Sequence, residues 1–526
     1  MPVDELLLNG HPRPFVSALW DSINRIGPPG LLQRGDQRDQ YLSMQGITFT
    51  LSGQERPLPI DLIPRVIEAD EWRVIELGIK QRVRVLEMFL HDVYGPQNVV
   101  ADGVVPKKLV TSSEHFHRAV HGIVPPNNVR IHVAGIDLIR DDNGTLRVLE
   151  DNLRCPSGVS YVLENRRTLA HVVPELFQDY AVRSVQEYPE QLLRALISSA
   201  PENVRDPVVV ILTPGVHNSA HFEHAFLARR MGVELVEGRD LFCKGNHVFM
   251  RTTAGASPVH VIYRRIDDDY LDPMHFLSGS LLGVPGLLNA ARAGNVAIAN
   301  AVGNGIADDK SLYRYVPHLI SYYLHEEPIL PNVDTYDLED PESLCYVLDN
   351  AQQMVVKPVA ASGGYGIVIG SQATNSELAR MKDVVQQDPR GWVAQPIVQL
   401  STCPTVMNDG SVAPRHIDLR PFAVNSGDDV WVLPGGLTRV ALVENSLVVN
   451  SSQGGGSKDT WVLTGTSSDL TGPITRPIVV SPDRRDEPTP REAGPNALPD
   501  LRLQQQEEQQ QQALFLHTVQ RQEGPC

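Results

Sequence analysis

The alternation of apolar and polar residues changes character several times along the chain. Over residues 60–94, apolar positions recur near the 3.6-residue period of a helix, and Gly95-Pro96 predicts where that helix ends. Over residues 129–152, two short apolar runs flank Asp141-Asp142-Asn143-Gly144, which is a strong hairpin signal. Residues 1–205 are therefore expected to form a helical scaffold that carries one β-hairpin.

The next stretch, residues 206–305, predicts a small Rossmann-like α/β domain inserted into the chain. Residues 208–212 are a continuous apolar run, typical of a buried parallel strand, and helical sequence follows over residues 220–231. A second strand is expected over residues 259–264. Ligands usually bind at the carboxyl ends of such strands, so the loop after the first strand is a candidate substrate site.

In residues 306–475, strands and glycine loops are expected to dominate up to about residue 463. Residues 476–526 are rich in Pro and Arg and then in Gln and Glu, so a disordered tail is expected there.

Length and composition narrow the class of protein. A chain of 526 residues exceeds the usual ~100 to 200 residues of one domain, so about three packed units are expected. A net charge of -17 disfavours nucleic-acid binding, and no run of about 18 apolar residues predicts a membrane span. Acidic residues near the start argue against a secretory signal, so a cytoplasmic enzyme acting on small molecules or peptides is expected. Five cysteines without CxxC spacing indicate neither disulfides nor zinc.

The hairpin carries a candidate metal site formed by Asp137, Glu150 and Asn152. A two-residue turn would place Asp137 opposite Glu150, and a four-residue loop would place it opposite Val148 with Glu150 on the same face. Two carboxylates and an amide oxygen suit Mg²⁺, which completes its shell with phosphate oxygens and water. The alternative is a solvated hairpin whose acids never meet.

A second candidate site surrounds Lys357. A short β run ends at this lysine, and a glycine loop over residues 360–366 and another β run follow. Backbone N–H groups of such a loop can close over phosphates, and the lysine adds a positive charge. A plain β-turn is the alternative. Further on, Gln395-Pro396 ends a strand and can offer backbone groups to adenine.

These motifs resemble a known family. Lys310 within Asp308-Asp309-Lys310-Ser311, Lys357, the glycine loop and Gln395 resemble the ATP-grasp nucleotide clamp in its usual order. The hairpin set resembles the Mg²⁺ ligands of that superfamily, which normally follow the clamp but here precede it. The chain therefore resembles the circularly permuted ATP-grasp family, related to glutathionylspermidine synthase, with an α+β or α/β fold.

The resemblance implies binding of ATP and Mg²⁺ and a ligase reaction that joins a carboxylate to an amine through an acyl phosphate. A phosphotransferase and a non-catalytic nucleotide-binding protein remain open. The metal ligands would be Asp137, Glu150 and Asn152, and the ATP contacts would be Lys310, Lys357, Ser362, Gly363, Gly364, Gly366 and Gln395.

Other charged residues are weaker candidates. Arg439 is the preferred cation for the phosphoryl group or substrate carboxylate, because its setting resembles ATP-grasp active-site strands. Arg154 could reach phosphate oxygens or form a structural salt bridge. Lys458 ends a glycine-rich segment that is either a lid or a linker. The substrate candidates are Asn218, Arg264, Arg265 and Arg420. His217, His221 and His224 have metal-like helical spacing, but packing is the better interpretation because no carboxylate motif accompanies them.

Overall fold

The computed structural model describes residues 2–51, 54–57, 59–359, 366–444, 446–449 and 455–465. The predicted tail and the loop residues Ser362, Gly363 and Gly364 lie outside this part of the chain. None of the described helices is long and apolar enough to cross a membrane.

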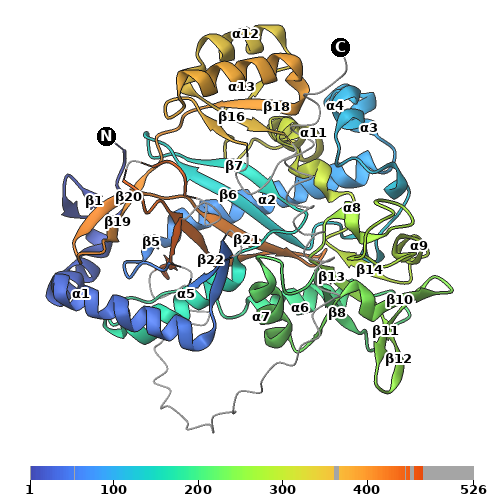
Figure 1. Cartoon of the computed structure of the whole chain (residues 1–526), viewed down its shortest axis with the longest axis horizontal. Coiled ribbons are helices and arrows are strands. Elements are labelled where there is room, and N and C mark those ends of the chain that lie inside the picture. Colours follow the sequence, from blue (N-terminus) through green and yellow to red (C-terminus); the bar gives the residue numbers. More distant parts are fainter. Residues whose placement is uncertain are drawn as a thin grey trace.

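The centre of the molecule is a five-stranded antiparallel sheet with the strand order β23-β22-β21-β6-β7 (Figure 1). The predicted hairpin supplies two of its strands, and late parts of the chain supply the other three. Segments far apart in sequence therefore pair directly, as Phe422 does with Gly135. The strands are β6 (Val133–Arg140), β7 (Leu146–Asn152), β21 (Arg420–Asn425), β22 (Val430–Val440) and β23 (Gly456–Lys458).

Helices cover both faces of this sheet, and the alternation of side chains along each strand decides which residues meet them. Ile136 of β6 belongs to the apolar cluster that contains the buried face of α2 (Ala69–Val93). Val133, out of phase with Ile136, packs with α5 (Val159–Val172) on the opposite face. Asp137 is in phase with Val133, so it points away from α2.

Helix α2 begins later than the apolar periodicity predicts. The residues before it are extended, and β5 (Arg65–Ile67) pairs in parallel with β24 (Thr460–Val462). Pro64 disfavours helical backbone in the residue before it, and acidic residues occupy the first turn of α2, where the helix dipole favours them. The prediction of helix over residues 60–68 is therefore wrong, whereas the predicted helix end is confirmed.

The stretch expected to be an inserted α/β unit contains a parallel sheet with the order β14-β13-β8-β9. Its two predicted strands are confirmed as β8 and β13, and its predicted helix as α7. A three-stranded antiparallel sheet, which was not predicted, projects to the right in Figure 1. The elements are β8 (Val209–Leu212), α7 (His221–Met231), β9 (Glu234–Val236), β10 (Leu241–Lys244), β11 (His247–Thr252), β12 (Gly255–Val259), β13 (Val261–Arg264), α8 (Asp268–Leu271), α9 (Leu287–Arg292) and β14 (Ala297–Ala299).

The later part of the chain contains more helix than predicted. Its antiparallel sheet has the order β15-β18-β16-β17, and the expected strand, glycine loop and strand around Lys357 are confirmed by the pairing of β16 with β17. Two helices, α12 and α13, cover this sheet at the top of Figure 1. The elements are α10 (Lys310–Tyr313), α11 (Val316–Leu324), β15 (Tyr336–Asp337), α12 (Pro341–Asp349), β16 (Met354–Pro358), β17 (Val368–Ile369), α13 (Asn375–Gln387) and β18 (Trp392–Pro396).

The remaining elements surround this frame, and the long helix α1 packs on α5. They are β1 (Leu7–Leu8), β2 (His11–Pro12), α1 (Ser17–Gln45), β3 (Thr48–Leu51), β4 (Gln54–Pro57), α3 (Asn98–Ala101), α4 (Lys107–Ser112), α6 (Tyr188–Ser198), β19 (Thr402–Val406) and β20 (Val412–His416). The 3-10 helices are Pro14–Val16, Arg118–Val120, Pro126–Asn128, Pro174–Phe177, Gly238–Asp240, Asn304–Asp308, Ala351–Gln353 and Pro389–Gly391.

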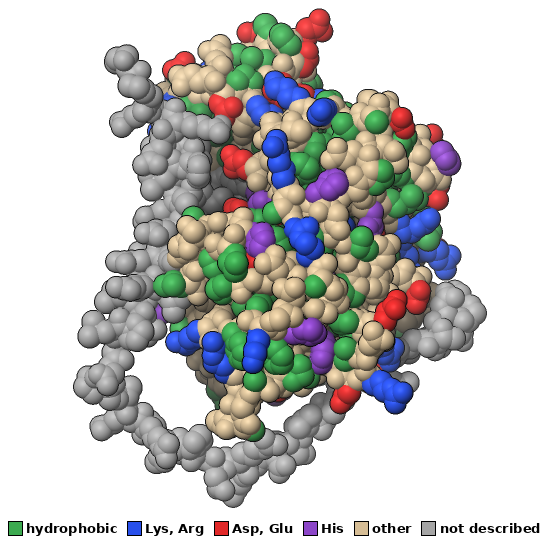
Figure 2. All heavy atoms as spheres, turned by 90° about the vertical axis from the view of Figure 1, so that its right-hand side faces the viewer, with side chains coloured by type: hydrophobic (Ala, Val, Ile, Leu, Met, Phe, Trp, Pro, Cys, Tyr) green, Lys and Arg blue, Asp and Glu red, His purple; other side chains and the backbone are tan. Residues whose placement is uncertain are grey.

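Figure 2 shows basic and acidic side chains interspersed over one face of the molecule. Proteins that follow a phosphate backbone present a continuous basic stripe or patch instead. The described residues on this face form no such surface.

Candidate active site

A cavity of about 520 Å³ lies where the β16 sheet meets the central sheet. Cavities of this size can hold a cofactor or a small substrate. One part of its wall is apolar and includes Val333, Val355, Ile367, Ile369, Ile397 and Leu447. Another part is charged and includes Asp137, Glu150, Asp151, Arg154, Asp308, Lys310, Lys357, Asp418, Arg420 and Arg439.

The hairpin places the three predicted metal ligands on one face. Asp137 lies opposite Glu150, and Asn152 lies opposite Gly135, two positions along the same face. The turn is neither of the two predicted loops, because the hydrogen-bonded ladder closes around residues 142–144. A bulge beside Asp137 shifts the register and restores its pairing with Glu150. The predicted juxtaposition is therefore confirmed, although a three-residue turn and a bulge together produce it.

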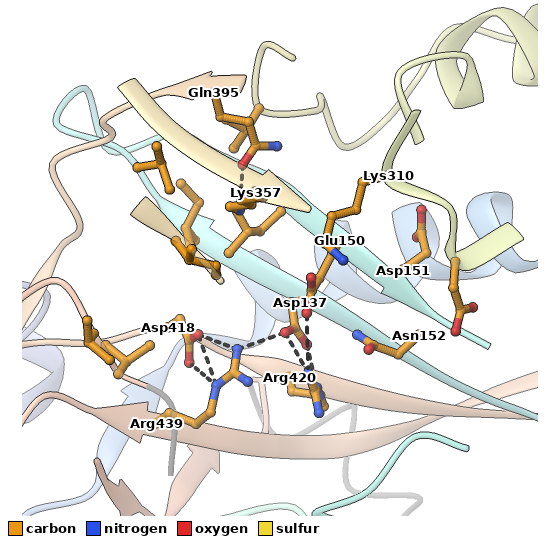
Figure 3. A pocket seen from close by; sticks show the side chains of 18 of the residues that line it. Asp137, Glu150, Asp151, Asn152, Lys310, Lys357, Gln395, Asp418, Arg420 and Arg439 are labelled. Carbon is orange, nitrogen blue, oxygen red and sulfur yellow. Dashed lines mark hydrogen bonds and ion pairs between the residues drawn. The ribbon is translucent and has the colours of Figure 1, made fainter. Parts of the chain in front are cut away.

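Two arginines and two carboxylates form the floor of the cavity (Figure 3). Arg420 donates to both oxygens of Asp137, at 2.5 and 2.7 Å, and Arg439 donates to Asp137 at 2.7 Å. Arg439 also donates through Nε to Asp418 at 2.9 and 3.0 Å. Burial alone would raise the pKa of Asp137, but Arg420 and Arg439 hold it well below its usual value. Burial raises the pKa of Asp418 despite its contact with Arg439.

The hairpin residues suit a hard cation in their chemistry. The side chain of Glu150 is 32% exposed and lies 3.7 Å from Arg420. The amide nitrogen of Asn152 donates to the Gly135 carbonyl at 3.3 Å, so its oxygen is the atom that can bind a cation. In the described chain, no group of three or more His, Cys, Asp or Glu side chains is arranged around a metal position. The candidate set is instead two carboxylates and an amide, which fits Mg²⁺ with phosphate oxygens and water as further ligands.

Two lysines reach the same cavity from different elements. Lys310 begins α10, and Lys357 lies in β16. Lys357 donates to the side-chain oxygen of Gln395 at 2.7 Å, and the Gln395 amide nitrogen donates to the Thr335 hydroxyl at 2.9 Å. Burial lowers the pKa of both lysines, and that of Lys357 falls to about 8, although Glu150 opposes the shift. Gln395 therefore lines the cavity while its side chain orients a lysine.

Within the predicted glycine loop, the structure describes Gly366. Its φ of 74° lies in the left-handed region, and a Cβ there would lie 2.9 Å from Pro358. Glycine suits this position because larger residues rarely adopt that conformation. The loop's role in covering phosphates stays a prediction.

Arg154 lines the other side of the cavity and is held by an acid. Its Nε donates to Asp308 at 2.9 Å, and Asp308 also accepts from the backbone N–H of Leu153 at 2.7 Å. Burial raises the pKa of Asp308 to about 6 against the opposing effect of Arg154. The salt-bridge interpretation of Arg154 is therefore confirmed, and its contact with phosphate oxygens stays a prediction.

The profile of the circularly permuted ATP-grasp type 2 family matches residues 64–441. The chain belongs to this family. Membership confirms the predicted fold class and accounts for the order of the motifs, in which the hairpin acids precede the clamp lysines. It also supports an ATP-dependent ligase as the general class of this protein.

Several proteins are similar to this chain over most of its length. An uncharacterized protein of Mycobacterium tuberculosis is 63% identical over 433 residues, which are 82% of this chain and 78% of the relative. An uncharacterized protein of Synechocystis is 51% identical, and the match covers 88% of this chain and 97% of that protein. A Frankia casuarinae protein provisionally named glutamate–cysteine ligase 2-2 is 45% identical over 87% of this chain, which spans 53% of that protein.

A solved structure shares the fold. The apo form of a glutathione synthetase-like effector from Globodera pallida has a TM-score of 0.55 and 13% sequence identity, and the match covers 83% of this chain and 98% of the effector. At this level of identity the similarity concerns fold alone.

The cavity lining includes three acids that were not among the predicted site residues, Asp151, Asp308 and Asp418. Asp308 and Asp418 each lie two residues before a predicted basic residue, Lys310 or Arg420. In a strand, that spacing puts two side chains on one face, so the neighbour of Arg420 could have been found from this signal.

Lys458 does not line the cavity, so its selection as an active-site residue is corrected. It is 0% exposed, and its ammonium contacts the Asp61 carboxylate and the Pro404 carbonyl, the latter at 2.8 Å. An ammonium enclosed in this way stabilises the fold and does not face a substrate. Gly456 and Ser457 of the predicted lid are likewise buried in β23 of the central sheet, and lid residues 451–454 lie outside the described part of the chain.

Arg264 and Arg265 are structural as well, which corrects their selection as substrate residues. Arg264 is 0% exposed and pairs with Asp268 at 2.7 Å. Arg265 donates to the Pro156 carbonyl at 2.9 Å and to the Ser157 hydroxyl at 2.5 Å. Arg265 therefore holds the turn that follows the hairpin, and neither arginine lines the cavity.

The predicted substrate loop reaches the cavity through a different residue. The side chain of Asn218 accepts from the Ala220 backbone N–H at 2.9 Å, while Ser219 lines the cavity. His224 is buried and shares a hydrogen bond with Thr213 at 2.9 Å, as expected for a packing role.

Proposed function

We propose that this chain is an ATP- and Mg²⁺-dependent ligase that joins a carboxylate to an amine through an acyl phosphate and releases ADP and phosphate. One observation carries the proposal. Two lysines, three oxygen donors on one hairpin face and an apolar wall share a single cavity of about 520 Å³. An apolar wall suits adenine, lysines suit phosphates, and oxygen donors suit Mg²⁺.

Each group has a role in the proposed reaction. The apolar wall receives adenine, and Lys310 and Lys357 hold the phosphates. Asp137, Glu150 and Asn152 would hold Mg²⁺, which supplies neutralisation of the charge that develops on the phosphates.

The chemistry needs no enzyme nucleophile. An oxygen of the substrate carboxylate attacks the γ-phosphorus of ATP, the bond from that phosphorus to the β–γ bridging oxygen breaks, and ADP leaves. The amine nitrogen then attacks the acyl carbon, the carbon–oxygen bond to phosphate breaks, and the nitrogen loses a proton as phosphate departs. Arg439 and Arg154 stabilise negative charge on the transferred group.

The relatives support the reaction class and leave the substrates open. A name of glutamate–cysteine ligase denotes formation of an amide bond, which agrees with the proposal. This chain spans about half of that protein, so glutamate and cysteine are candidates to test and are not assigned.

The first test is ATP binding by isothermal titration calorimetry, with and without Mg²⁺. The wild type is expected to bind ATP in a Mg²⁺-dependent way, and Glu150→Gln is expected to lose that dependence. Glu76→Gln is a matched control, because Glu76 is also partly exposed, at 26%, and pairs with Lys80 on α2 away from the cavity. A folded wild type that binds no ATP would refute the proposal.

The second test is ADP release from pools of acids and amines. Release that requires both a carboxylate and an amine supports the ligase. Release with one acceptor and no amine, together with a phosphorylated product, would show a phosphotransferase instead.

A further inference from the structure

The two carboxylates on the cavity floor share one arginine unequally (Figure 3). Arg439 contacts Asp418 through both Nε and Nη2, and its Nη2 also donates to Asp137 at 2.7 Å. Arg420 gives two hydrogen bonds to Asp137, at 2.5 and 2.7 Å. Arg439 therefore has two carboxylate partners, and Asp137 has two arginine partners.

Asp137 cannot face a cation fully while both arginines engage it. It accepts three hydrogen bonds, so turning toward a metal ion means giving up part of them. A buried guanidinium left without an acceptor is strongly destabilised. Arg439 keeps Asp418 in that case, whereas Arg420 has Glu150 at 3.7 Å and the Ser157 carbonyl at 3.4 Å.

Asp418 is fixed from the side away from the cavity. Its carbonyl accepts from Arg65 at 3.1 Å, and its backbone N–H donates to the Arg439 carbonyl at 3.2 Å. Arg65 in turn donates to both oxygens of Glu5, at 2.7 and 2.6 Å, and both side chains are buried. The next residue, Leu419, bridges to Leu138 in the metal hairpin. Asp418 is therefore a rigid anchor between the hairpin and the strand of Arg439.

From this geometry we infer that Asp418 is a positioning residue that holds Arg439 while Asp137 exchanges its arginine contacts for a metal ion. The inference rests on the proposed function. Asp418 acts through Arg439: by holding that arginine, it makes it easier for Asp137 to bind the metal ion. In Asp418→Asn, Asp137 becomes the one carboxylate still holding Arg439, so Arg439 competes more strongly with a cation for Asp137.

The test measures the Mg²⁺ concentration that gives half-maximal ATP binding, by calorimetry without carboxylate or amine substrates. Asp418→Asn is expected to raise this concentration by about tenfold, within the usual range of coupling between contacting residues. In an Arg439→Gln background, the same substitution is expected to leave it unchanged. A mere loss of negative charge near the metal would act in both backgrounds, so equal shifts would overturn the inference.

Asp61→Asn is the matched control, because Asp61 is a buried acid that pairs with Lys458 outside the cavity. It is expected to lower the unfolding temperature without moving the Mg²⁺ midpoint. If Asp418→Asn does not fold, Asp418→Glu replaces it, with a smaller upward shift expected, and an unchanged midpoint would overturn the inference. A wild type without ATP binding would refute the proposed function itself, whereas a normal wild type with an unshifted variant refutes only the role of Asp418.

Discussion

Lys357 and Lys458 are both buried, with exposed fractions of 8% and 0%, but their surroundings differ. Lys458 contacts the Asp61 carboxylate and two backbone carbonyl oxygens. Lys357 donates to the neutral amide of Gln395, and among the described residues no carboxylate forms an ion pair with it.

The difference indicates what each lysine does. Burial lowers the pKa of Lys357 to about 8, and neighbouring Lys310 adds to the shift while Glu150 opposes it. A buried cation without an acid partner is unfavourable until an anion arrives. Lys458, already neutralised, stabilises the fold, whereas Lys357 is placed to receive a negatively charged ligand.

The largest expected effect is on stability, in Lys458→Met. The substitution leaves the buried carboxylate of Asp61 without its cation, and breaking a buried pair costs about 3 to 5 kcal/mol. Guanidinium unfolding would measure the loss in free energy of unfolding. A change within error of zero would contradict a structural role for Lys458.

The same substitution at the other lysine should act on ATP binding instead. Lys357→Met removes a buried charge that has no acid partner, so the free energy of unfolding is expected not to fall. ATP affinity is expected to drop about 100-fold, because hydrogen bonds to charged groups contribute roughly 1.5 to 3 kcal/mol. Calorimetry gives the affinity and guanidinium unfolding the stability. A stability loss as large as that of Lys458→Met would remove the distinction between the two lysines.

Local patterns explain why the hairpin that carries the candidate metal ligands could be predicted from the sequence. Asp137, Glu150 and Asn152 share a face because side chains alternate along strands, and that rule operates within a few residues of one turn. The three-residue turn alone would put Glu150 on the other face, and the bulge beside Asp137, which the local pattern did not predict, restores the pairing. The strand, glycine loop and strand around Lys357 were also predicted from neighbouring residues, and both strands, β16 and β17, are present.

Long-range partners explain what the sequence could not provide. Lys458 finds Asp61 across almost the whole described chain, and no local pattern signals that contact. Arg264 and Arg265 do lie at the carboxyl end of a strand, as predicted, but they turn toward the segment after the hairpin. Asp418 holds Arg439 in the neighbouring strand, so the sequence places both residues without showing that they touch.

A smaller effect is expected from pH. In the protein without nucleotide, the pKa of Lys357 is about 8, so raising the pH through this value removes the charge of its ammonium. ATP affinity is therefore expected to fall by up to about tenfold for each pH unit above this pKa. Lys357→Arg should flatten this dependence, since arginine stays protonated. The free energy of unfolding is expected to change in the opposite direction. Above pH 8, Lys357 holds its proton more readily in the unfolded chain than in the folded one, so its contribution to the free energy of unfolding rises with pH. Calorimetry and unfolding from about pH 7 to 9.5 would measure both.

The smallest expected effect comes from Gln395→Glu, which gives Lys357 the acid partner that Lys458 already has. The new carboxylate would occupy the position of an amide oxygen 2.7 Å from the ammonium. It would raise the pKa of Lys357 and compete with phosphate, so ATP affinity is expected to fall about fivefold, or roughly 1 kcal/mol, while stability is kept. The pH-dependent loss of binding should move to higher pH. Gln395→Met is the control without charge, and its pH dependence should stay near that of the wild type. Tighter ATP binding by Gln395→Glu would show that neutralising this lysine does not oppose the nucleotide, and the contrast between the two lysines would then lose its functional meaning.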